Sequence, residues 1–237
     1  MSLQIMQICK SCGSRGPGNY CNACGQAFTS PRLTVKGIFH EVFHFFTHLD
    51  KGFPFTLKNL IAHPGEMQRK YVEGARNRHQ KPFSMFFVCA SFAALALYWI
   101  NSTLINYFNA GDVQEGAFFH KYWVLTQICL LPLYAFITYF FFRRSKYNYA
   151  EICVLLLYQF SFLFVLLVAI HVTRLLWHHL QTRYIELPLI IVYSTITNLN
   201  FFNKLPRWAC ILRSTFSIGI CFLLAIFVQY VLIKTFS

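Results

Sequence analysis

Four cysteines near the start of the chain form two Cys-x-x-Cys-Gly motifs. Cys9 and Cys12 belong to the first motif, and Cys21 and Cys24 belong to the second. This spacing puts two thiolates on one turn, and the following glycine lets the backbone fold so that its N–H groups point at sulfur. Two such turns supply four tetrahedral ligands for Zn²⁺ at about 2.3 Å. The sequence therefore predicts a four-cysteine zinc site, with a rubredoxin-like iron site as the second choice.

A closed four-cysteine site offers no open position for a substrate, so we expect a structural or docking role for it. Residues 1–30, the predicted zinc ribbon, are too few to bury a core that folds alone, which would couple metal binding to folding. Two disulfides are the alternative, but they need an oxidising compartment. The charge distribution described below argues for the reducing side of a membrane.

The next stretch, residues 33–49, has apolar side chains at helical spacing and predicts an amphipathic helix on the membrane interface. Its opposite side carries Lys36, His40, Glu41, His44 and His48. An interfacial polar face is the favoured interpretation. The alternatives are a second metal site on His40, His44 and His48, or a face that responds to pH.

A metalloprotease is the enzymatic alternative, because the same stretch contains the pattern His-Glu-x-x-His. His40 and His44, one helical turn apart, would bind zinc, and Glu41 would act as general base on metal-bound water. The third ligand would have to come from Glu66 or Glu73 in the following segment. No downstream stretch carries a recognisable third-ligand motif, so the sequence favours a protein that is not an enzyme.

These residues stand ahead of a chain that is built for a membrane. Of 237 residues, 56% are hydrophobic and 12% charged, which is not the composition of a soluble domain. Five apolar runs are long enough to span the hydrocarbon: residues 83–105, 123–142, 149–170, 185–202 and 210–233. The fourth run is the shortest and most polar. We expect an all-α membrane protein, a helical transmembrane bundle of about five spans with a small N-terminal zinc ribbon.

The positions of the basic residues predict the orientation of this bundle in the membrane. Seventeen of the 21 Lys and Arg residues lie in the N-terminal region, in the second loop, or between and just inside the fourth and fifth runs. By the positive-inside tendency the N-terminus is cytoplasmic, and with five spans the C-terminus lies outside. If the fourth run fails to span, the C-terminus returns to the cytoplasm. The first residues show no signal peptide.

A basic cluster directly before the first span predicts attachment to anionic lipids of the inner leaflet. Its members are Arg69, Lys70, Arg76, Arg78 and Lys81. Each cation close to an anionic leaflet contributes about 1 kcal/mol to membrane binding. The formal net charge of +13 is explained by such membrane-facing positions, so nucleic acid is not an expected partner.

Several short motifs in the first half of the chain resemble one family. They are Cys-x-x-Cys-Gly, Tyr20-Cys21-x-x-Cys24-Gly25-Gln26, Thr56-Leu57, Pro64-Gly65, Tyr71-Val72-x-Gly74-x-Arg76 and Pro82-Phe83. Together they resemble an uncharacterised bacterial zinc-ribbon membrane family, a domain of unknown function. The resemblance implies a bacterial cytoplasmic membrane and carries no established activity.

Polar side chains inside the apolar runs could line a path or form ordinary interhelical hydrogen bonds. The deeper ones are Gln127, Gln159, Asn198, Asn200 and Gln229. Glu151 and Glu186 lie near the ends of runs and can reach an interface. His171, His178 and His179 fall in the outer connection, where we expect solvent around them.

Three units follow from these patterns: a ribbon over residues 1–30, a cytoplasmic juxtamembrane region over 31–82, and the bundle over 83–237. The favoured function is a non-enzymatic membrane scaffold or regulatory module whose ribbon docks a cytoplasmic protein. A small transporter or channel-like protein is the close alternative. It would need a continuous polar cavity through the spans. The oligomeric state stays open.

Overall fold

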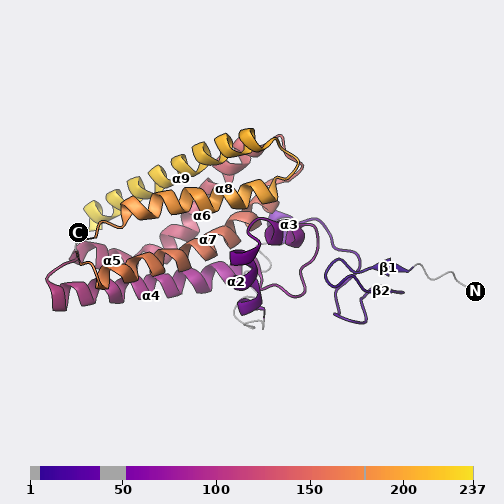
Figure 1. The fold of residues 1–237 in the computed structure, drawn as a ribbon, viewed down its shortest axis with the longest axis horizontal. Helices are drawn as coiled ribbons and strands as arrows, with labels where there is room; N and C mark the ends of the chain where they lie inside the picture. Colours follow the sequence, from indigo (N-terminus) through magenta and orange to yellow (C-terminus); the bar gives the residue numbers. More distant parts are fainter. Residues whose placement is uncertain (1–5, 38–51, 179, 237) are drawn as a thin grey trace, which may run out of the picture.

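The computed structural model describes residues 6–37, 52–178 and 180–236. It is predominantly helical, and its long helices lie side by side (Figure 1). The ribbon, α2 (Phe53–Ala62) and α3 (Glu66–Val72) lie at one end of this bundle. The C-terminus lies at the other end, which we call the far end.

Four helices are long and apolar enough to cross a membrane. They are α4 (Pro82–Phe108), α6 (Trp123–Phe142), α7 (Tyr149–Val172, continued by a short 3-10 turn to Leu175) and α9 (Arg207–Phe236). Large apolar side chains remain exposed on their outer faces, including Trp99, Phe140 and Phe227. Such side chains are stable against lipid and would be costly in water. The chain therefore has the helices of a membrane protein.

A fifth helix, α8 (Arg183–Phe201), runs beside them but is shorter and more polar, and does not belong to that set. Near its start, the Glu186 carboxylate pairs with His171 at the end of α7. Near its end, the Asn200 amide donates to the carbonyl of Pro64, beside α3. Its two ends therefore lie at opposite ends of the bundle. A short helix, α5 (Val113–Lys121), closes the connection between α4 and α6 at the far end.

Local sequence explains where the spans begin and end. Pro82 opens α4 at a position where its missing N–H costs nothing, and Asn109 ends that helix with a left-handed φ of 48°. Asn148 and Glu151 form a capping box at the start of α7, each side chain accepting from the other's backbone N–H at 2.8 Å. α7 is the most buried span, whereas α9 lies at the edge.

The ribbon consists of two knuckles beside a small antiparallel sheet. Strands β1 (Gln7–Ile8) and β2 (Arg15–Gly16) flank the first knuckle, and Tyr20 bridges to Ala27 around the second. Among the described residues, Phe28 is the large apolar side chain that packs on the cysteines. The predicted helix over residues 33–49 lies, beyond residue 37, outside the described residues.

Gly65 sits where α3 meets α8 and should not tolerate a side chain. Its φ is 81°, and an added Cβ would lie 2.1 Å from the carbonyl oxygen of Thr197. We expect Gly65→Ala to lower the free energy of unfolding by about 1–3 kcal/mol, because of backbone strain and this overlap. The midpoint of thermal unfolding in detergent measures it. Gly219→Ala is the control, because a Cβ on Gly219 in α9 meets nothing within 4 Å. An unchanged midpoint for Gly65→Ala would contradict this packing.

Candidate metal centre

The two cysteine knuckles have the same backbone geometry. In the first, the N–H of Gly13 donates to the carbonyl of Cys9 at 2.9 Å, and in the second Gly25 donates to Cys21 at 2.8 Å. Gly13 and Gly25 have φ values of 76° and 72°, in the left-handed region that glycine adopts without strain. The sequence pattern predicted that the glycines let the backbone turn with N–H groups pointing at sulfur; the N–H groups of the glycines themselves donate to cysteine carbonyls.

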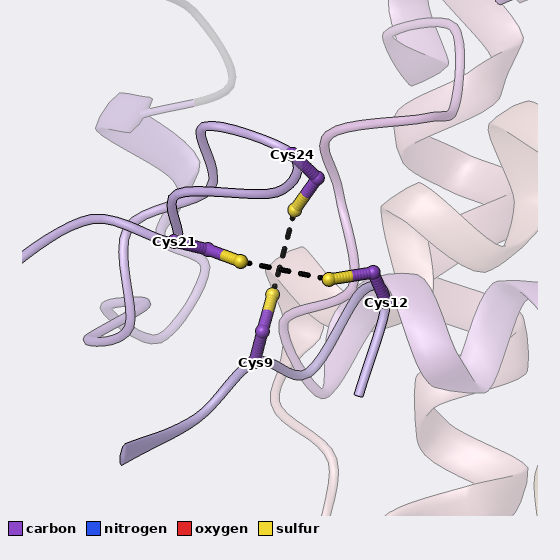
Figure 2. Close-up of side chains that lie close together, drawn as sticks. All are labelled: Cys9, Cys12, Cys21 and Cys24. Carbon is purple, nitrogen blue, oxygen red and sulfur yellow. Dashed lines mark hydrogen bonds between the residues drawn. The ribbon is translucent and has the colours of Figure 1, made fainter. Parts of the chain in front are cut away.

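The four sulfurs of these knuckles face one centre (Figure 2). All lie within 4.8 Å of one another. Cys9 and Cys24 are 3.5 Å apart, as are Cys12 and Cys21, so each short contact joins one knuckle to the other. Four sulfurs at about 2.3 Å from a tetrahedral Zn²⁺ would be about 3.8 Å apart. The observed cluster fits a four-coordinate ion.

The acid–base chemistry of the sulfurs also fits a cation. The backbone N–H of Cys12 lowers the pKa of Cys9, and the Ser14 hydroxyl and N–H lower the pKa of Cys12 to about 6. The N–H of Gln26 lowers the pKa of Cys24, but burial and the neighbouring sulfurs outweigh it and raise that pKa to about 12. Without a cation, adjacent thiolates repel one another. A divalent ion at their centre would remove this repulsion.

Gln26 fastens the ribbon to the segment that follows α3. Its side-chain carbonyl accepts from the N–H groups of Arg76 and Asn77, at 3.2 and 3.0 Å, and its amide donates to the carbonyl of Gly74. Asn77 in turn donates to the carbonyl of Cys24. Gln26 is only 7% exposed, so these bonds replace lost water. The metal site is therefore held against the juxtamembrane segment.

A second attachment joins the ribbon's exit to the start of α7. The Arg32 guanidinium pairs with both oxygens of Glu151, at 2.8 and 3.0 Å, and donates to the carbonyl of Lys146. Glu151 is buried, and the hydrogen bond that Arg32 donates to Glu151 raises the pKa of the guanidinium. Lys146 also pairs with Glu73. Sequence reasoning did not find this clamp, because its partners are more than a hundred residues apart.

The five basic residues predicted to bind lipid headgroups differ in their contacts and in their exposure. Arg76 donates to the carbonyls of Pro31 and Tyr71, so it also holds the ribbon linker. Lys70 pairs with Glu66 at 2.7 Å, while Arg78 and Lys81 are exposed. Arg69 is half-buried. Headgroup binding by this cluster stays a prediction.

The residues of the protease alternative lie outside the described residues. These are His40, Glu41, His44 and His48. Both candidate third ligands, Glu66 and Glu73, are engaged by lysines. Within residues 6–37, 52–178 and 180–236, the four cysteines are the only group of three or more potential metal ligands that lie together.

The polar residues of the spans separate into two sets. Gln127, Gln159, Asn198 and Gln229 line a common cavity inside the bundle, whereas Asn200 is bonded to Pro64. His171 does not lie in solvent as predicted. It is 5% exposed and pairs with Glu186 at 3.0 Å. His178 stacks on Phe108, and His179 lies outside the described residues.

The fold and this site define a helical membrane protein with a four-cysteine head that could bind a metal. A family model described as "Protein of unknown function (DUF3667)" matches residues 50–93, less than a fifth of the chain. The match covers α2, α3 and the first part of α4. It agrees with the resemblance to an uncharacterised family. No curated protein and no solved structure matches the chain.

Elemental analysis of the purified full chain tests the metal centre. We expect one zinc per chain, and its loss in Cys12→Ser/Cys21→Ser, because two ligands cannot hold a structural ion. Cys129→Ser is the matched control, since Cys129 is an exposed thiol on α6. Zinc that persists in the double variant would refute the site. A second metal that is lost only in His40→Ala/His44→Ala would support the metalloprotease alternative.

Proposed function

We propose that this protein is a non-enzymatic scaffold or regulatory module of the bacterial cytoplasmic membrane. Its ribbon holds a structural zinc ion on Cys9, Cys12, Cys21 and Cys24, and docks a cytoplasmic protein. The single observation that carries the proposal is the closed four-sulfur cluster on a head fastened to the bundle. Such a head presents a fixed surface, and its metal has no open position for chemistry.

The docking face we propose lies around Ile8 and Tyr20. Both side chains are more than half exposed, at 59% and 66%, although they are large and apolar. Arg15, paired with Ile8 across the small sheet, is exposed too. Exposed tyrosine and arginine side chains are enriched in interface hot spots. The partner is therefore a protein with an apolar patch that an acidic group flanks.

The topology we propose has five crossings, with the ribbon in the cytoplasm and the C-terminus outside. It is supported by the basic residues near the ribbon end, among them Arg143, Arg144 and Lys204. It is also supported by the contacts of α8, which reach His171 at one end and Pro64 at the other.

A small transporter is the second candidate, and the polar cavity in the bundle is the observation that favours it. At the ribbon end, however, packed aromatic side chains fill the bundle: Phe142 stacks on Phe202 with ring centres 4.1 Å apart, and Tyr147 lies tilted against Phe201 with ring centres 4.4 Å apart. Transport would require this layer to open.

Photo-crosslinking in living cells tests the docking role. A photoreactive amino acid at position 20 or 8 should capture one cytoplasmic protein. The crosslink should disappear in Cys12→Ser/Cys21→Ser, which unfolds the ribbon. Position 99 is the control, because Trp99 is 71% exposed on the lipid-facing side of α4. Equal capture from positions 20 and 99, or none from position 20, would refute docking at this face.

Reporter fusions test the topology. Alkaline phosphatase fused after Ser237 should be active, and green fluorescent protein fused there should be dark, because the C-terminus would be outside. Fusions after Lys204 should give the opposite result, since that loop would be cytoplasmic. A fluorescent C-terminal fusion would show that α8 does not cross and that the chain has four spans.

A further inference from the structure

A cavity inside the bundle has the features of a binding site, independently of what the ribbon does. It lies among α5, α6, α7, α8 and α9, and its volume is about 200 Å³. This is many times the volume that one water molecule needs on the same measure. Its walls mix aromatic side chains with neutral polar ones. Among the polar ones are Gln127, Gln159, Ser194, Asn198 and Ser217.

Four residues that line this cavity each have a buried polar atom without a hydrogen-bond partner in the described part of the chain. The atoms are Trp123 Nε1, Gln159 Oε1, Ser194 Oγ and Asn198 Oδ1. Gln159 is 4% exposed, Asn198 2%, and Ser194 fully buried. Buried polar groups are nearly always paired, because an unpaired one keeps the full cost of losing water. Four such atoms on residues that line one cavity, from three helices, point to a ligand that supplies their partners.

The deep part of the cavity is neutral. Its polar side chains are amides and hydroxyls, with Thr138 and Ser217 in contact at 3.2 Å and Asn198 donating to Ser214 at 3.1 Å. A charged ligand would meet no compensating charge there and would be excluded. Indole N–H is a donor, whereas the amides and hydroxyls offer both donors and acceptors. The ligand must therefore be neutral and carry both kinds of group.

The charged wall residues all lie at the far end. His171 Nε2 and Glu186 Oε1 are 3.0 Å apart, and Arg183 is exposed. An exposed residue belongs to the wall at this end, which favours an entrance here. Near it, Phe119 and Phe164 lie edge-on to Trp123, with ring centres 5.2 and 5.9 Å away. Aromatic walls of this kind favour a ligand with a flat or apolar face.

We propose that this cavity binds a small neutral molecule that carries amide or hydroxyl groups beside a flat or apolar face. The ligand enters from the far end. Gln159, Ser194 and Asn198 hydrogen-bond its polar groups, while Trp123 donates to an acceptor and packs against its face. The aromatic layer at Phe142 and Phe202 stops it before the ribbon end.

Fluorescence quenching in lipid vesicles tests the site with acrylamide, a neutral flat amide, as the probe. The chain Trp99→Phe/Trp177→Phe/Trp208→Phe keeps Trp123 as its only tryptophan. Acrylamide should quench Trp123 at least about tenfold more strongly than iodide, because the anion is excluded. The matched control keeps Trp99 instead. Trp99 should be quenched by brominated lipid and hardly by acrylamide, since it faces outward.

The outcomes separate clearly. Stronger quenching of Trp123 by brominated lipid than by acrylamide would mean that a lipid chain fills the cavity, and the proposal would fail. Equal quenching by iodide and acrylamide would mean that Trp123 faces water without selection against charge. Absence of quenching by acrylamide would mean that the cavity is closed. Either outcome would overturn the proposal. Gln159→Leu/Asn198→Leu should lower acrylamide quenching several-fold by removing the amides. If that variant does not insert, the acrylamide and iodide comparison decides alone.

Discussion

The pairing of polar groups that leave water is the constraint on which this structure depends. In hydrocarbon an unpaired N–H or C=O costs several kcal/mol, so spans are helices and their polar side chains must find partners. At the ribbon end Gln26 uses both ends of its amide and Glu151 binds Arg32 through both oxygens, whereas Gln68 Nε2 and Gln80 Oε1 are buried without a partner in the described part of the chain. Inside the bundle, four buried polar atoms without a partner in the described part of the chain belong to residues that line one cavity.

The metal centre is the second requirement, because Phe28 alone cannot supply a core for the ribbon. A bound ion would fix the two knuckles, and the fixed knuckles place Gln26 against Gly74 and Cys24 against Asn77. Gly74 has a φ of 118°, and a Cβ there would lie 3.0–3.2 Å from Lys10 and Ser30. The ribbon therefore packs closely against the juxtamembrane segment because residue 74 is a glycine. This explains why two sets of short motifs that are about 50 residues apart belong to a single structure.

Much of this arrangement could be predicted from local patterns. Cysteine spacing predicted the sulfur cluster, and hydropathy predicted five spans, of which four are helices long and apolar enough to cross a membrane, since both depend on residues close in sequence. The clamp between Arg32 and Glu151 could not be predicted, because nothing local relates residues 119 apart. Nor could sequence tell Asn198 from Asn200: two residues along a helix turn the side chain to a different face, one toward the cavity and the other toward Pro64. His171 was expected in solvent because it was placed in the connection after the third apolar run. Its partner, Glu186, lies on the next helix, so the pair could not be seen from local sequence.

α7 connects the two functional regions, since it begins at the Arg32 clamp and ends at the pair of His171 with Glu186. Coupling between them would require an element with two stable positions that both sites bias. The start of α7 is held in one position by its capping box and by the ion pair between Arg32 and the buried Glu151, and Phe142, Phe201 and Phe202 pack beside it. Movement on ligand entry would therefore be easiest at the far end, where α8 and the connection after α7 carry exposed residues such as Tyr184 and Leu176. This asymmetry favours a ribbon that stays fixed as an anchor while the opposite end adapts to what it binds.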